Sequence, residues 1–100
     1  MSITSTLSDD GRIVTIHVNG RFDFAAHQAF LHAYKGYPRG ERQFVVDLKN
    51  AEYMDSSAMG MLLQLREYGD KAAGVTLVNA NPAVAEILRI ANFDKLFEIG

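Results

Sequence analysis

Residues 44–62 read FVVDLKNAEYMDSSAMGML, and this stretch decides the fold. It opens at Phe44 with a nearly continuous run of strand-forming residues, which is typical of an interior strand with neighbours on both sides. A short polar loop is expected after Leu48. From Ala58 onward, apolar residues recur at helical spacing over about three turns. The stretch therefore predicts a buried strand, a loop and a helix, and its junction carries an acid and two hydroxyls, Asp55, Ser56 and Ser57.

Two strands and a helix are expected before this stretch. Residues 3–7 alternate in polarity, as a half-buried strand does. Asp10-Gly11 is a two-residue hairpin signal, and the returning strand over residues 12–18 has one apolar and one mostly polar face. Asn19-Gly20 is expected to end that strand. Residues 21–36 then predict a helix that begins near Asp23, whose side chain can cap free N–H groups.

After residue 62 the pattern predicts a strand, a helix and a last strand. The strand covers residues 75–78. Asn81 and Pro82 are a typical helix cap and first helical residue, and residues 93–99 are expected to form a final strand. The order is ββαβαβαβ, and right-handed crossovers place the helices on one face if each crossover steps to the next strand in the same direction. The prediction is a single α/β domain, residues 1–100, with a mixed, mostly parallel sheet of about five strands and helices mainly on one face.

Composition excludes several classes of function. The chain of 100 residues has no cysteine, which removes disulfides and thiolate chemistry. Its formal charge of −2 and its diluted basic cluster (Lys35, Arg39 and Arg42 beside Glu41) argue against direct nucleic-acid binding. The N-terminus does not resemble a secretory signal, and no apolar run is long enough to span a bilayer. We therefore expect a cytoplasmic protein without membrane contacts or a cofactor.

Catalytic and metal sites find little support in the pattern. His27 and His32 are five residues apart and do not share a helix face as i,i+4 zinc ligands would. Asp23 and His27 are four apart and could form a surface pair. Ser56 and Ser57 lie outside any Gly-x-Ser-x-Gly elbow. No catalytic residue or metal ligand is predicted, although a small hydrolase using Ser56 or Ser57 stays open as an alternative.

The junction before the second helix has two interpretations. In the first, Asp55 is an ordinary N-cap, with Met54 and Met59 at the positions of a hydrophobic staple. This registry leaves Ser56 at the first helical position with its hydroxyl free. In the second, Ser56 is phosphorylated, which adds about −1.5 to −2 charges at a helix N-terminus that favours anions. Asp55 would oppose that charge, so the main consequence would fall on a surface presented to a partner.

Resemblance to a known family bears on this choice. The segments Val45-Val46-Asp47-Leu48 and Met54-Asp55-Ser56-Ser57-Ala58-Met59-Gly60 resemble the signature of STAS-domain anti-sigma factor antagonists, also called anti-anti-sigma factors. Three further stretches are similar, and they are Gly20-Arg21-Phe22-Asp23, Val75-Thr76-Leu77-Val78 and Pro82-Ala83-Val84 leading to Phe93. The match spans nearly the whole chain. It implies the STAS fold, a small mixed sheet with helices packed on it.

The resemblance implies a non-enzymatic switch in transcription regulation by partner switching. Family members bind an anti-sigma factor when unphosphorylated. A serine kinase, often the anti-sigma factor itself, phosphorylates the first serine of the pair. This serine corresponds to Ser56, and Ser57 is the less favoured site. A PP2C-type phosphatase removes the phosphate. The implied partner surface consists of Asp23, Asp55, Ser56, Ser57 and Met59.

Two residues depart from the family pattern. Ala58 stands where the family usually has Gly, and Arg21 often corresponds to Glu, so the charge facing the partner differs. An alternative is a STAS module that binds a nucleotide or another signalling enzyme, with Ser56 only structural. The oligomeric state and the identity of the partner stay open.

Overall fold

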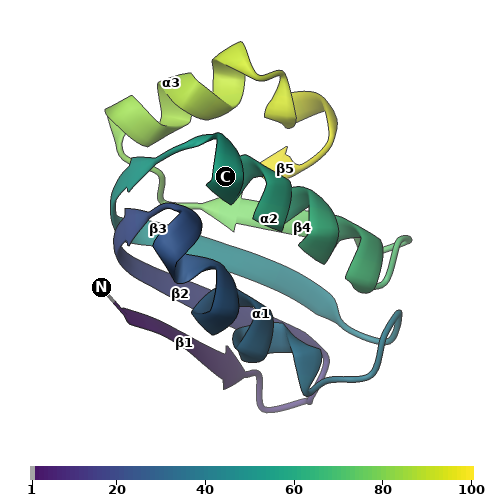
Figure 1. The fold of residues 1–100 in the computed structure, drawn as a ribbon. Coiled ribbons are helices and arrows are strands. Elements are labelled where there is room, and N and C mark those ends of the chain that lie inside the picture. The colour runs from purple at the N-terminus through teal and green to yellow at the C-terminus, as the bar shows by residue number, and fades with distance from the viewer. Residues whose placement is uncertain (1) are drawn as a thin grey trace.

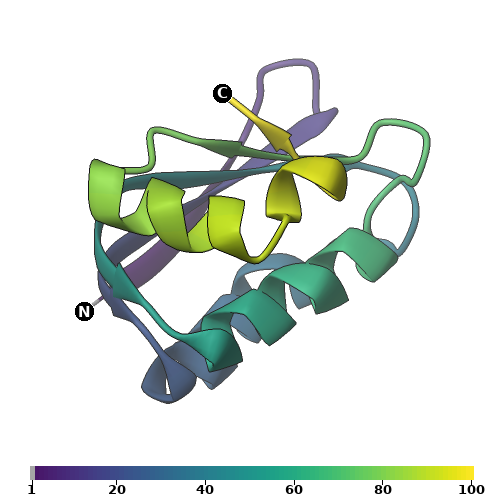
Figure 2. The same ribbon diagram turned by 90° about the horizontal axis from the view of Figure 1, so that it is seen from above.

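A five-stranded sheet with helices on one face forms the molecule (Figures 1 and 2). The computed structural model describes residues 2–100. The strands lie in the order β1-β2-β3-β4-β5; β1 pairs antiparallel with β2, and the three remaining pairings are parallel. The elements in chain order are β1 (Ser2–Leu7), β2 (Ile13–Phe22), the 3-10 helix η1 (Phe24–Ala26), α1 (His27–Lys35), β3 (Gln43–Met54), α2 (Ser56–Tyr68), β4 (Val75–Val78), α3 (Pro82–Ile90), the 3-10 helix η2 (Phe93–Lys95) and β5 (Glu98–Ile99). The predicted fold class and element order are confirmed.

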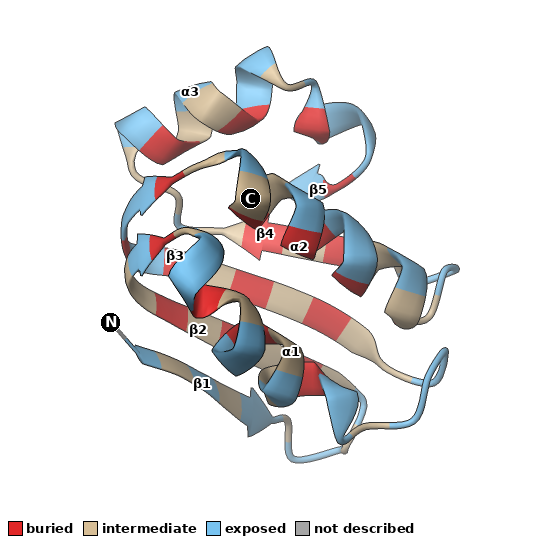
Figure 3. Cartoon of the chain, viewed as in Figure 1, coloured by how far each residue is buried: buried red, intermediate tan, exposed pale blue. Residues whose placement is uncertain are grey.

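One apolar core lies between the sheet and the helices (Figure 3). Alternate residues of each central strand face it, as the pleat of a strand requires, and in β2 these are Val14, Ile16 and Val18. The intervening residues are only partly buried and form an open face of the sheet. The predicted polar face of the second strand is therefore confirmed.

The central strands are longer than predicted. Asn19-Gly20 does not end β2, which continues to Phe22, and β3 runs without a loop from Gln43 to Met54. Two register shifts in the β2–β3 ladder, between His17 and Asn19 and between Gly20 and Arg21, explain the error. Such irregularities break the two-residue alternation by which a strand is recognised in a sequence. The sequence pattern in the second half of β3 therefore predicted a loop.

Three other details differ from the prediction. The connection between β1 and β2 is a loop of residues 8–12 rather than a two-residue turn; the Ser8 amide bonds the Ile13 carbonyl at 2.8 Å, and Gly11 takes a positive φ of 74°. The helix predicted over residues 21–36 begins as η1 and becomes α1 at His27. Residues 93–99 are mainly η2 and a connector, with β5 reduced to two residues. The bulky residues there, Phe93 and Phe97, are buried in the core rather than alternating along a strand.

No helix within residues 2–100 is both long enough and apolar enough to cross a bilayer.

Candidate functional site

The corner where β3 leads into α2 is built around Asp55. Its backbone is extended (φ −115°), and its Oδ1 accepts a hydrogen bond from the Ala58 N–H at 3.0 Å. This is the geometry of an N-cap. The Asp55 N–H donates to the Phe22 carbonyl at 3.3 Å, which joins the start of α2 to the end of β2. The predicted capping role of Asp55 is confirmed, and the bond to Phe22 brings the η1 region beside it.

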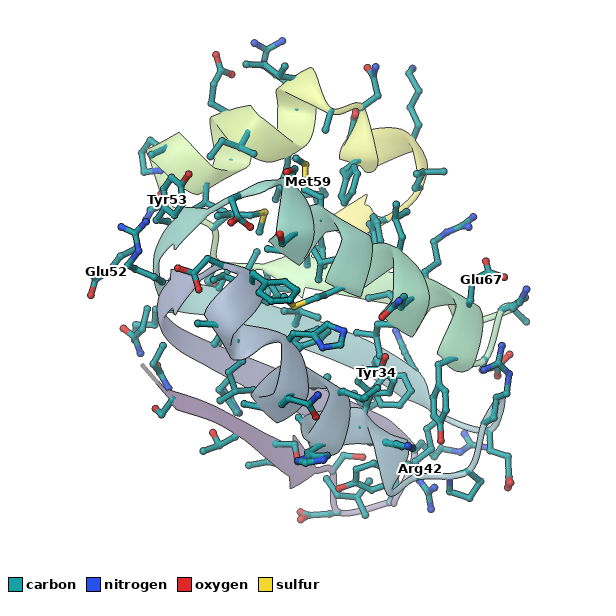
Figure 4. The ribbon with its side chains drawn as sticks, in the orientation of Figure 1. Tyr34, Arg42, Glu52, Tyr53, Met59 and Glu67 are labelled. Carbon is teal, nitrogen blue, oxygen red and sulfur yellow. The ribbon has the colours of Figure 1, made fainter. Side chains whose placement is uncertain are left out.

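The two serines occupy the first turn of α2 and differ in exposure. Ser56 is the first residue of the helix and is exposed, whereas Ser57 is half-buried. Asp55 already occupies the Ala58 N–H, so neither serine is required as the cap. The first N–H groups of a helix have no acceptor within it, which makes this end favourable for an anion. Met59 is partly buried: it packs against the core and keeps part of its side chain at the surface (Figure 4).

Asp23 lies at the neighbouring helix start. Its Oδ1 accepts from the Ala25 N–H at 3.1 Å, so it caps η1, and its Oδ2 lies 3.4 Å from Arg21 Nε. The Arg21 guanidinium in turn stacks 4.5 Å from the centre of the Tyr53 ring. The pair expected between Asp23 and His27 is replaced by the Asp23–Arg21 pair. Arg21 thus has two partners, and its charge is held beside the corner.

A shallow groove between η1 and α2 extends this corner, and sequence reasoning missed it. Phe24 is 73% exposed, and its ring stacks on His27 with 6.1 Å between centroids. The groove encloses about 230 Å³ and is lined by Phe24, His27, Ser57, Gly60, Met61 and Gln64. Phe24 is the most exposed large apolar side chain within residues 2–100, and it supplies apolar surface at the edge of the groove. One feature of the sequence could have indicated that Phe24 is exposed. Phe24 follows the helix cap Asp23 directly and lies outside the apolar stripe of Ala26, Phe30 and Tyr34.

A second polar cluster lies on the open face of the sheet, away from the groove. His17 Nδ1 lies 3.2 Å from Asp47 Oδ2, and His17 Nε2 lies 3.3 Å from Thr6 Oγ1. Burial alone would raise the pKa of Asp47, but hydrogen bonds from Asn79, from the Lys49 N–H and from His17 outweigh it and leave the pKa lowered. The cluster joins four strands or their ends. Within residues 2–100, no group of three histidines and acids could hold a metal ion.

Comparison with known proteins gives one family and one relative of similar length. The family model described as "Mlab, STAS domain" matches residues 5–98. The STAS-domain containing protein PA14_20770 of Pseudomonas aeruginosa is 51% identical over 100 residues, and the match covers 99% of each chain.

Solved structures show the same fold at lower identity. An anti-sigma factor antagonist from Mycobacterium paratuberculosis is 24% identical, with a TM-score of 0.75 over 98% of this chain and 85% of that one. The anti-sigma factor antagonist SpoIIAA in its unphosphorylated form is 18% identical, with a TM-score of 0.69 over 99% of this chain and 88% of that one. The Bacillus protein SpoIIAA in its phosphorylated form is also 18% identical, with a TM-score of 0.64 over 99% and 91%.

Proposed function

This chain belongs to the STAS domain family, and on that premise we propose that it is an anti-sigma factor antagonist switched by phosphorylation of Ser56. The unmodified protein binds a regulatory partner, an anti-sigma factor or a related signalling protein, and the phosphorylated protein releases it. The whole of residues 1–100 acts as one STAS domain. The structures of SpoIIAA in unphosphorylated and phosphorylated forms support the proposal, because they show this fold carrying such a modification.

The observation that carries the proposal is the position of Ser56. It is exposed, it is the first residue of α2, and Asp55 performs the capping that a serine could otherwise perform. Its hydroxyl is therefore available to a kinase without loss of the helix start. Ser57 is half-buried and lines the groove, which makes it the less accessible acceptor.

The switch acts at the surface rather than through the fold. A phosphate on Ser56 adds about −1.5 to −2 charges next to the Asp55 carboxylate. The exposed N–H groups of α2 offset part of that repulsion, so the domain keeps its structure. A partner packed against the corner would have to accommodate a buried, doubly charged group, and desolvation of such a group weakens binding.

The partner surface consists of Asp23, Asp55, Ser56, Ser57 and Met59. Asp23 and Asp55 contribute mainly by holding the two helix starts in place, since each carboxylate caps its own helix. Ser56 and Ser57 contribute the contact itself, and Met59 contributes apolar area at its edge. The protein is then a substrate for a serine kinase and a PP2C-type phosphatase, and not an enzyme.

Affinity capture from cells of the source organism tests the proposal. Tagged wild type, Ser56→Ala, Ser56→Asp and Ser57→Ala are used as baits, and the captured proteins are compared by mass spectrometry. We expect wild type, Ser56→Ala and Ser57→Ala to capture the same regulatory protein and Ser56→Asp to lose it. Equal capture by all four baits would refute the switch. A phosphate mapped to Ser57 in the cell would move the site by one residue.

A further inference from the structure

The helices α1 and α2 lie side by side on the sheet (Figures 1 and 2), and two cavities follow one another along the space between them, which we call the furrow. Its near end is the groove at Phe24 and Ser57. Its far end is a second cavity of about 350 Å³, lined by Leu31, Tyr34, Lys35, Arg39, Gln64, Glu67 and Tyr68. Gln64 lines both cavities, so they are adjacent. From Ser57 to Tyr68 the furrow follows α2 for roughly 17 Å, or three helical turns.

The near end of the furrow is lined by apolar side chains and leaves the α2 backbone uncovered at Gly60. Phe24 and Met61 supply the apolar surface. A Cβ added at Gly60 would meet no atom within 4 Å, so the space above the α2 backbone is free at this point. A partner can therefore approach the helix backbone more closely here than any other residue would permit.

The far end of the furrow is aromatic and basic. Tyr34 and Tyr68 meet edge to face with 5.0 Å between ring centroids, and Figure 4 shows Tyr34 between α1 and α2. The Tyr68 hydroxyl donates to the Tyr37 carbonyl at 2.5 Å, with the Lys35 carbonyl oxygen 3.1 Å away, and this bond fixes the ring. The Arg39 guanidinium lies 5.5 Å from the centre of that ring. This end is a preformed apolar surface with cations at its rim.

The two ends of the furrow differ in charge. Lys35 and Arg39 are both exposed at the far end. Glu67 also lines this end, but it lies 3.0 Å from Lys71 Nζ and 3.7 Å from Arg66 Nη1, so its charge is compensated within α2 and its extension. A ligand thus meets a net positive potential at one end and an uncharged lining at the other.

We propose that the furrow binds an amphipathic helix of the regulatory partner, about three turns long, with apolar residues along its contact face and acidic residues over Lys35 and Arg39. The inference rests on the proposed function and names the chemistry of the partner. A helix fits because the two walls are themselves helices that present side chains rather than free backbone groups, and a third helix packs into such a groove. The acidic end follows from charge complementarity.

The binding energy is then divided between two ends. Ser57 lines the near end, and Ser56 is its neighbour, so phosphate disturbs this end directly. The contacts at Lys35 and Arg39 lie some three turns away. The far end keeps the partner in register when the near end is modified, and we expect a residual, salt-sensitive interaction of the phosphorylated protein.

The experiment uses defined peptides in place of the unidentified partner. The probe is a fluorescein-labelled, helix-stabilised peptide of about twelve residues with leucines on one face and two glutamates near one end. A matched peptide carries lysines in place of the glutamates. Fluorescence anisotropy at low salt should show the glutamate peptide binding about tenfold more tightly. Amide shifts should map to His27, Gly60 and Gln64.

Three variants sharpen the result. The double variant Lys35→Glu with Arg39→Glu should reverse the order of the two peptides, and Lys95→Glu, an exposed control on η2, should preserve it. Gly60→Leu should fill the near end and abolish binding of the glutamate peptide while raising helix propensity, and an unchanged Tm of this variant distinguishes the loss of binding from unfolding. Equal affinity of the two peptides, or shifts confined to the open face of the sheet, would overturn the inference.

Two further outcomes separate the possibilities. A concentration-dependent dimer in sedimentation velocity that Gly60→Leu abolishes would overturn the proposal in favour of a second copy. If the glutamate peptide binds the furrow while capture from cells is indifferent to Ser56→Asp, the furrow stands and the phosphorylation switch fails. If Ser56→Asp abolishes capture while neither peptide binds the furrow, the switch stands and the furrow fails.

Discussion

Replacement of Asp55 separates its structural role from any direct role in recognition. Asp55→Ala removes the 3.0 Å hydrogen bond to the Ala58 N–H and the negative charge at the start of α2. Loss of an N-cap costs about 1 kcal/mol, and loss of a charge at a helix N-terminus costs about 0.5 kcal/mol. Asp55→Asn keeps an acceptor oxygen and loses only the charge. The two variants should therefore differ by about 1 kcal/mol in the free energy of unfolding.

The unfolding entropy of a domain of this size converts these energies into temperatures. At about 0.2 kcal/mol per kelvin for 100 residues, Asp55→Ala should lower Tm by about 7 °C and Asp55→Asn by about 2 °C. Ser56→Ala, which removes an exposed hydroxyl that does not cap, is the matched control and should change Tm by less than about 2 °C.

Thermal and urea unfolding followed by circular dichroism measure the three variants. Equal destabilisation by Asp55→Ala and Asp55→Asn would refute the capping argument, because the loss would then follow the charge and not the hydrogen bond. Full stability of Asp55→Ala would also refute it and would leave Asp55 with a role in recognition alone.

Three other predictions concern the core, the open face and the end of α2. Leu65→Ala should lower the free energy of unfolding by about 2–5 kcal/mol, whereas Leu63→Ala, on the exposed side of the same helix, should change it by less than about 1 kcal/mol; urea unfolding compares them. Because the pKa of Asp47 is lower in the folded state, its carboxylate stabilises the fold above the unfolded pKa of about 4, and this contribution is lost as pH falls through the folded pKa. Asp47→Asn should flatten that part of the stability curve, measured by urea unfolding between about pH 2 and pH 6, and an unchanged slope would contradict the assignment. Gly69→Ala should destabilise the domain, since the new Cβ would lie 2.9 Å from Phe44 Cδ2; a Tm equal to wild type would show that the Phe44 ring moves aside.

Much of the fold follows from local signals in the sequence. Asn81 caps α3 through its bond to the Val84 N–H at 2.8 Å, and Pro82 takes the first helical position, both as predicted. The same local chemistry identified Asp55. These residues act over three or four positions, and a cap can therefore be recognised without knowledge of the rest of the chain.

The errors in the predicted secondary structure arise where contacts between segments distant in the sequence determine the local structure. The second half of β3 is a strand because β2 lies beside it, with Gly20 opposite Ala51 and Arg21 opposite Tyr53. The predicted last strand is present but shorter than expected, because residues 93–97, which include the buried Phe93 and Phe97, form η2 and a connector, and only Glu98–Ile99 pair with β4. Register and core volume are properties of the assembled sheet, and a single sequence does not display them.

The candidate site also contains some residues that the sequence could identify and some features that only the folded structure reveals. Asp23, Asp55 and the two serines were identified from caps and from family resemblance, and the structure brings their two helix starts together through the bond from the Asp55 N–H to the Phe22 carbonyl. Phe24 and the furrow were not foreseen. Exposure of an aromatic side chain depends on what packs around it, and sequence periodicity carries no such information.

The irregular ladder between β2 and β3 has a consequence for insertions and deletions. Across its two register shifts, buried residues of β3 recur every third position, at Leu48, Ala51 and Met54, instead of every second. The number of residues between Leu48 and Met54 therefore determines which side chains of this segment face the core. Removal of one residue between Leu48 and Met54 would carry Met54 out of the core and rotate the start of α2 with it. The loop of residues 36–42 joins β3 at the opposite end from Ser56, and its exposed tip, residues 38–41, can vary in length without moving Ser56. In homologous chains, we expect length variation to collect in that loop and to be absent from residues 48–54.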